Sequence, residues 1–174
     1  MFKINDVAIY GSEGVCKIIS IEKRMFADDE TEYYVFVPLC NNNNTNIYVP
    51  TNNEKALMKL KLVCSKEEID DMIKHIGDEK SVWIEDETAR REEYGRIIKS
   101  GSRLEILNMI KTLYLHRKEM AAAKKKFHSA DERLLNIAEN MIFQEFAYVL
   151  GIECGEVWNY IKNHTALFLY KNTI

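Results

Sequence analysis

The hydrophobic period changes once along the chain, near residue 65, and this change limits the possible folds more than any other feature. Before it, apolar residues stand in short runs rich in Val, Ile, Tyr and Phe. After it, they recur every three or four residues. The first pattern is typical of β-strands and the second of amphipathic helices. We therefore predict an α+β chain of two modules, with an all-β domain at 1–62 and an all-α helical domain at 63–174.

Four apolar runs in the first module predict strands that turn-forming segments separate. The turn segments are GSEG at 11–14, ADDET at 27–31 and NNNNTN at 41–46. The runs are FKINDVAIY, GVCKIISIEKRMF, EYYVFVPL and NIYVP. So many short strands in so few residues favour a small, strongly bent sheet or a β-barrel, with Pro38 and Pro50 at strand ends because proline cannot donate a ladder hydrogen bond.

Three capping-box patterns introduce the helices of the second module. Each pairs a serine with a glutamate three residues later: SKEE from Ser65, SRLE from Ser102 and SADE from Ser129. An apolar stripe at helical spacing follows each pattern, which is the arrangement expected at a helix N-terminus. Gly151 stands where the last of these helices should end, and Gly101 stands where the helix before Ser102 should end.

Charge is unevenly distributed, although the net charge is −3. Residues 101–128 carry seven basic and two acidic side chains, a local excess of five positive charges. This basic segment can contact phosphates, but it can also be the solvated face of a helix. If the protein acts on DNA, another interaction must bring it there.

No catalytic or cofactor-binding motif was found. The chain has no HExxH, GxxxxGK[ST], GxGxxG or GxSxG pattern, and its four cysteines form no CxxC pair. The four histidines fit no metal-ligand spacing, so we expect them at the surface or at helix ends. We expect no enzyme, no cofactor and no metal site, and free thiols in a cytoplasmic protein that has no membrane-spanning segment.

In the stretch SVWIEDETARR at 81–91, six residues separate Trp83 from the pair Arg90 and Arg91. Three acids lie between them and suit the first turn of a helix, where the helix dipole favours negative charge. In a helix over about 84–99, Arg90 lies near the edge of the apolar stripe and Arg91 is turned away from it. Trp83 then has two possible roles. It can be a packing anchor at the helix start, or an aromatic side chain held at the surface for a functional contact.

In the order of these features the chain resembles the bacterial CarD/CdnL family of RNA polymerase-binding transcription regulators, especially its Firmicutes-type branch. The resemblance includes the opening FKINDVAIYGSEGVCKIISIEKR and the later EYYVF and NIYVP. In the second half it includes the tryptophan, the arginine pair, the helix stop at Ser100 and Gly101, and the helices IKTLYLHRKE and SADERLLNIAENMIFQEFAYVLGI.

The resemblance implies a Tudor-like N-terminal domain that docks on the RNA polymerase β subunit. The helical domain would contact promoter DNA at the upstream edge of the melted bubble, without base specificity, and stabilise the open complex. Polymerase contacts are expected from Arg24, Met25, Phe26, Ile47, Tyr48 and Pro50. DNA contacts are expected from Trp83 as a minor-groove wedge and from Arg90, Arg91, Lys124, Lys125 and Lys126. We expect a monomer that does not associate with a membrane.

Two positions depart from the family pattern. Trp83 stands farther from the arginine pair than is common in the family, and Tyr48 occupies a position before Val-Pro that is basic in the family. The alternative to a polymerase-docked DNA binder is a helical adaptor or scaffold that binds another protein without DNA.

Overall fold

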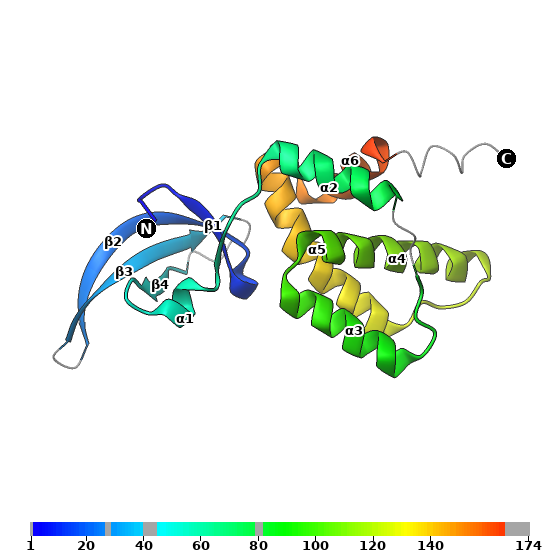
Figure 1. Cartoon of the computed structure of the whole chain (residues 1–174), viewed down its shortest axis with the longest axis horizontal. Helices are drawn as coiled ribbons and strands as arrows, with labels where there is room; N and C mark the ends of the chain where they lie inside the picture. Colours follow the sequence, from blue (N-terminus) through cyan, green and yellow to red (C-terminus); the bar gives the residue numbers. More distant parts are fainter. Residues whose placement is uncertain (1, 27–28, 40–44, 79–81, 166–174) are drawn as a thin grey trace. The chain divides into compact units, whose positions relative to one another are not determined.

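The computed structural model describes residues 2–26, 29–39, 45–78 and 82–165. The chain divides into two compact units, Met1–Ser65 and Lys66–Ile174. The first unit holds the strands and the second the helices, as the coloured ribbon of Figure 1 shows. The predicted α+β chain of two modules is therefore confirmed, and each unit is described by itself below.

The N-terminal unit is a five-stranded antiparallel sheet in the order β4-β3-β2-β1-β5. Two short helical segments accompany it, η1 at Gly11–Glu13 and α1 at Glu54–Leu57. The strands are β1 Val7–Tyr10, β2 Val15–Phe26, β3 Asp29–Pro38, β4 Ile47–Pro50 and β5 Leu60–Leu62. The four predicted runs all contain strands, whereas the short β5 was not among them.

The sheet is open, so the small Tudor-like β-barrel expected from the sequence is not closed. β4 and β5 form its two edges and pair only with β3 and β1, respectively, in the described part of the chain. β4 has four residues and β5 three, which leaves little backbone with which to close a barrel. β2 and β3 are longer than the strands beside them, so their hairpin extends beyond its neighbours (Figure 1).

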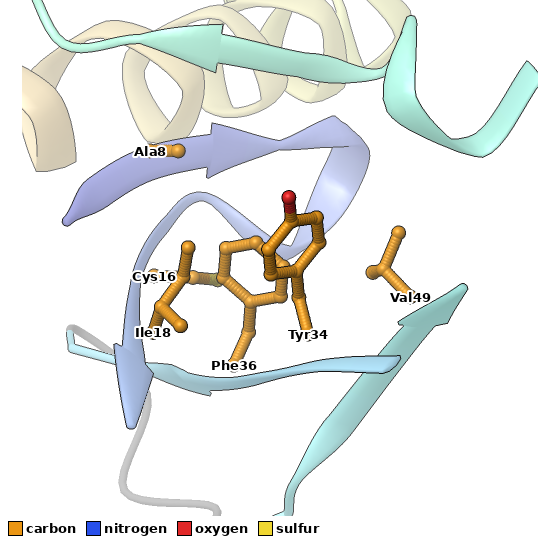
Figure 2. Packing of buried hydrophobic residues seen from close by; sticks show 6 residues of the cluster. All are labelled: Ala8, Cys16, Ile18, Tyr34, Phe36 and Val49. Carbon is orange, nitrogen blue, oxygen red and sulfur yellow. The ribbon is translucent and has the colours of Figure 1, made fainter. Parts of the chain in front are cut away.

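One face of this sheet carries the hydrophobic core of the N-terminal unit. Side chains from β1, β2, β3 and β4 converge there, as Figure 2 shows. They are Ala8, Cys16, Ile18, Tyr34, Phe36 and Val49. Alternate residues of a strand point to the same face, which explains why Tyr34 and Phe36 are both buried. The prediction that these two aromatic residues belong to the core is confirmed.

A β-bulge in β2 changes which residues face the core. Ile18 pairs with Phe36, but the next paired residue is Ser20, opposite Val35. The extra residue, Ile19, shifts the alternation by one position. Beyond the bulge, the even-numbered residues Ser20, Glu22 and Arg24 therefore lie on the face opposite the core. This shift determines the position of Arg24.

The C-terminal unit consists of five α-helices and one short 3₁₀ segment in its described part. The α-helices are α2 Lys66–Asp78, α3 Glu87–Ser100, α4 Arg103–Ala122, α5 Ser129–Leu150 and α6 Val157–His164, with η2 at Cys154–Glu156. Apolar residues of α2, α4, α5 and α6 are buried between the helices. None of these helices is long and apolar enough to cross a membrane.

The helix ends follow most of the sequence signals. Ser102 caps α4 by accepting a hydrogen bond from the Glu105 backbone N–H, while Gly101 and Gly151 end α3 and α5 in the left-handed conformation. The predicted cap at Ser129 is wrong, because α5 already begins there and His128 is the N-cap residue. The helix after Trp83 also begins later than predicted, at Glu87, because the Asp86 side chain caps it.

Buried polar pairs connect the helices. Arg90 of α3 donates two hydrogen bonds to Asp131 of α5, each 3.0 Å long, and both side chains are buried. Arg103 at the start of α4 pairs with the buried Glu145 of α5, with a 2.8 Å bond between Nε and Oε2. Lys111 of α4 is buried and donates to the Ile76 carbonyl near the end of α2. Two residues of the predicted basic segment, Arg103 and Lys111, are thus engaged within the unit.

The Tyr94 hydroxyl of α3 is buried, and none of the residues that the structure describes forms a hydrogen bond with it. Burial is the main cause that raises the pKa of Tyr94 to about 12. We expect Tyr94→Phe to increase the free energy of unfolding by about 1 kcal/mol, since an unsatisfied buried hydroxyl is removed.

Urea denaturation at pH 7 measures this gain. A tyrosine whose pKa is raised on folding stabilises the protein fully below its unfolded pKa, and this contribution is lost as pH rises from about 10 to about 12. The Tyr94→Phe protein should therefore lose less stability than wild type over that pH interval. A decrease in stability at pH 7 would show that the hydroxyl has a partner.

Candidate functional sites

Arg24 and Tyr48 form a contact on the face of the sheet opposite the core. Arg24 lies in the extended part of β2, beyond the bulge, and Tyr48 lies in the edge strand β4. The Arg24 Cζ is 3.8 Å from the centroid of the Tyr48 ring, a cation–π geometry. About two-fifths of the Arg24 side chain remains exposed, so the guanidinium is held and still accessible.

Glu22 and Ser20 hold Arg24 from the other side. The Glu22 Oε2 accepts hydrogen bonds from Arg24 Nη2 at 3.1 Å and Nε at 3.3 Å, and Oε1 accepts from the Ser20 hydroxyl at 2.8 Å. The Ser20 hydrogen bond and then Arg24 lower the pKa of Glu22 below its usual value. Glu22 hence remains ionised at neutral pH and fixes the guanidinium beside Tyr48. We call Ser20, Glu22, Arg24 and Tyr48 the arginine patch.

In the helical unit, two groups stack on the indole of Trp83. The ring centroids of Trp83 and His116 are 3.5 Å apart, with an interplanar angle of 12°. The Arg90 Cζ lies 4.3 Å from the Trp83 ring centroid. Two flat groups this close to one ring would overlap on a single face, so Arg90 and His116 cover opposite faces. Trp83 itself is half-buried.

Arg90 fixes the segment that leads into α3. It is only 3% exposed. Besides its two bonds to Asp131, its Nη1 donates to the carbonyls of Ile84 at 2.7 Å and Glu85 at 3.2 Å. These bonds hold the residues next to Trp83, so Arg90 both positions the indole and covers one of its faces.

A basic loop joins α4 to α5. Its residues Lys124, Lys125 and Lys126 are all exposed. Lys124 has a φ of 55°, and the hydrogen bonds from Lys124 N to Ala121 O and from Lys125 N to Met120 O end α4 as in a Schellman motif. The next residue, Phe127, lies with its ring centroid 6.4 Å from that of His116. Trp83, His116 and Phe127 thus form an aromatic row that ends beside the basic loop.

The comparison with protein families decides what the N-terminal unit is. Residues 2–61 match the family model described as CarD-like/TRCF RID domain. The chain carries a CarD-like/TRCF RID domain. The predicted CarD resemblance is confirmed over these residues, and RID domains interact with RNA polymerase. The match supports an RNA polymerase-interacting, transcription-related protein and ends before the helical unit. No curated protein matches the chain.

The structure brings together only part of the polymerase contact set predicted in the RID domain. Arg24 and Tyr48 meet in the arginine patch. Ile47 packs against the core cluster, as its alternation with the buried Val49 requires. Met25 is 70% exposed but alternates with Arg24 and so lies on the opposite face of the hairpin. Pro50 is half-buried at the end of β4, and the side chain of Phe26 lies outside the described part of the chain.

The predicted DNA-contacting residues of the helical unit also differ in accessibility. Arg91 and the three lysines of the basic loop are exposed, whereas Arg90 is buried and committed to Asp131. We therefore leave Arg90 out of the surface proposed to contact DNA. His116, predicted at the surface, keeps only 19% of its side chain exposed because it stacks on Trp83.

Sequence reasoning missed the residues that hold these sites in place. They are Ser20 and Glu22 in the RID domain, and His116, Phe127 and Asp131 in the helical unit. The spacing of Ser20, Glu22 and Arg24 along one strand face was a usable signal. His116 and Asp131 lie far from Trp83 and Arg90 in sequence, so no local pattern indicates their contacts.

Proposed function

We propose that the protein is a non-catalytic transcription regulator that docks on the RNA polymerase β subunit and stabilises the open promoter complex. The main support for this proposal is the match of residues 2–61 to the RID family model. The same residues form the sheet that exposes the arginine patch. An arginine that is held in place and still exposed loses little conformational entropy on pairing with a carboxylate of a partner. The proposal needs binding alone, with no cofactor or metal, and it implies action in the bacterial cytoplasm.

Docking on polymerase would compensate for a helical unit with weak affinity for DNA. The whole chain has a net charge of −3, and the basic loop supplies only three exposed lysines. A few phosphate contacts give binding that physiological salt weakens strongly. Attachment to polymerase raises the local concentration of the helical unit at the promoter, so that weak contacts suffice.

The aromatic row and the basic loop support DNA contact at the upstream edge of the bubble. Lysines 124–126 can pair with phosphates, which position a protein on DNA without reading its sequence. The exposed part of the Trp83 ring can pack against an opened base step, and an inserted apolar side chain of this kind compensates for part of the unstacking cost. Arg90 and His116 hold the ring in one orientation, so little freedom is lost when it contacts DNA.

Trp83→Phe tests this wedge without removing its support. A phenyl ring can still stack between Arg90 and His116, so we expect the free energy of unfolding to fall by no more than about 1 kcal/mol. The smaller ring reaches less far into the duplex. We expect the lifetime of open complexes formed with polymerase and the full-length protein to shorten severalfold, measured by the decay of promoter-bound complexes after addition of a competitor.

Trp158→Phe is the matched control, because Trp158 is also half-buried and stacks on a ring, that of Tyr114, at 4.2 Å. This variant should leave the open-complex lifetime at the wild-type value. Equal lifetimes for wild type and Trp83→Phe would make Trp83 a packing residue only. If the wild-type protein bound polymerase but changed no open complex, it would act instead as an adaptor between proteins.

A further inference from the structure

Gly95 lies in the interior of α3, and nothing in the described fold requires a glycine there. Its backbone is not in the left-handed region, and among the described residues an added Cβ would meet no atom within 4 Å beyond its chain neighbours and the backbone of its own helix. Glycine weakens a helix interior relative to almost any other residue. This glycine lowers helix stability, and no neighbour within the protein needs the space. We therefore ask whether it allows the close approach of another molecule.

The missing side chain opens a depression on the outer surface of α3. Its lining residues are Arg91, Glu92, Gly95, Arg96, Lys99 and Ser100. Arg91 and Lys99 stand four residues before and after Gly95, on the same side of the helix. Both are exposed, and no ion pair of the described residues involves either of them.

Arg96, the third cation of the depression, is already paired. It donates to both carboxylate oxygens of Glu93, at 3.0 and 2.7 Å, and to Glu105 at 3.5 Å. The two available cations are therefore Arg91 and Lys99, separated by two helical turns or about 12 Å. Gly95, midway between them, has no side chain to block an approaching strand, while Glu92 and the paired Arg96 line the sides of the depression.

We propose that the sugar–phosphate backbone of DNA lies across α3 at Gly95, with Arg91 and Lys99 each contacting a phosphate. This inference rests on the proposed function and adds a second contact surface to the helical unit. Cations on both sides of a glycine suit a regularly charged polymer, whereas the centre of a protein interface is depleted of charge and enriched in aromatic residues. The depression has no aromatic or aliphatic side chain in its lining.

A charge test uses full-length Arg91→Ala/Lys99→Ala protein and a fluorescent fork-shaped duplex DNA, with affinity measured by anisotropy from low to moderate salt. Each lost phosphate contact reduces the slope of log affinity against log salt by about 0.9. We expect the slope to fall by about 2 and the affinity at low salt to fall about tenfold. The matched control is Lys66→Ala/Lys74→Ala, which removes two exposed lysines of α2.

A steric test uses Gly95→Gln. Glutamine is a better helix former than glycine, and its Cβ meets nothing, so the thermal midpoint of unfolding should rise. Its side chain fills the depression without changing charge, so we expect DNA affinity to fall at least threefold. A protein that is more stable and yet binds DNA more weakly cannot be explained by damage to the fold.

Several outcomes would overturn the inference. DNA affinity of Gly95→Gln equal to wild type would do so, as would a loss in Arg91→Ala/Lys99→Ala no larger than in the α2 control. Weakened polymerase binding by Gly95→Gln with unchanged DNA affinity would make the depression a protein contact. Absence of any DNA binding by the wild-type protein at low salt would instead reject the DNA contact of the proposed function, and this inference with it.

Discussion

Asp131→Ala should lower the free energy of unfolding by roughly 3–5 kcal/mol, the usual effect of removing one partner from a buried ion pair. The Asp131 side chain is fully buried, and Arg90 opposite it is 4% exposed. Without the carboxylate, the guanidinium keeps the carbonyls of Ile84 and Glu85 as its acceptors among the described residues. Because Arg90 also covers one face of Trp83, the segment before α3 should loosen together with the contact between α3 and α5.

Urea denaturation followed by circular dichroism measures this loss, and two variants bracket it. Glu93→Ala breaks the exposed pair between Glu93 and Arg96 in the same helix, so the loss there should be far smaller than in Asp131→Ala. Arg90→Met/Asp131→Leu removes both charges and should recover most of the stability, since apolar residues can replace a buried ion pair. A loss in Asp131→Ala as small as that in Glu93→Ala would show that water reaches Arg90.

Arg24→Glu should reduce affinity for the RNA polymerase β subunit by at least about 100-fold, the size of effect seen when a central interface arginine is lost. The substitution removes the cation held against Tyr48 and puts a second carboxylate beside Glu22. A partner surface that is complementary to arginine would then face like charges. The fold should remain intact, because the Arg24 side chain is partly exposed and lies outside the core.

Lys23→Glu is the control for this charge reversal. Lys23 is the neighbouring residue of β2, its side chain is 65% exposed, and it lies on the opposite face of the hairpin. The change in net charge is the same as for Arg24→Glu, so a general electrostatic effect would weaken both variants alike. Isothermal titration with purified β subunit should find Lys23→Glu close to wild type. Equal losses of affinity in Lys23→Glu and Arg24→Glu would show that the β subunit responds to the charge of the whole hairpin, and not to Arg24 in particular.

The order of elements could be predicted from the sequence because it depends on local patterns. The change of hydrophobic period separated the two units, and Gly101 and Gly151 marked two helix ends. Whether the sheet closes into a barrel could not be predicted from local patterns. Closure depends on whether two short edge strands, β4 and β5, pair with each other. The division into domains at 1–62 and 63–174 stays a prediction, since it implies that each part folds independently.

The candidate sites were harder to predict because their contacts are long-range. The bulge at Ile19 determines which face Arg24 occupies, and no turn or glycine signals it. The burial of Arg90 was partly indicated by its position four residues before Tyr94, but its partner Asp131 is 41 residues away. Alternation along β4 would have assigned Ile47 to the core with Val49. Trp83 is half-buried, which fits both roles that the sequence suggested, and the Trp83→Phe variant distinguishes them.

We propose above all that this chain binds the RNA polymerase β subunit through the arginine patch of its RID domain. The most direct measurement is the binding of the full-length protein to purified β subunit, by titration calorimetry, for wild type and Arg24→Glu in parallel. We predict saturable binding of one protein per β subunit for wild type and no measurable binding for Arg24→Glu. Absence of binding by the wild-type protein, or equal affinity of the two proteins, would contradict it.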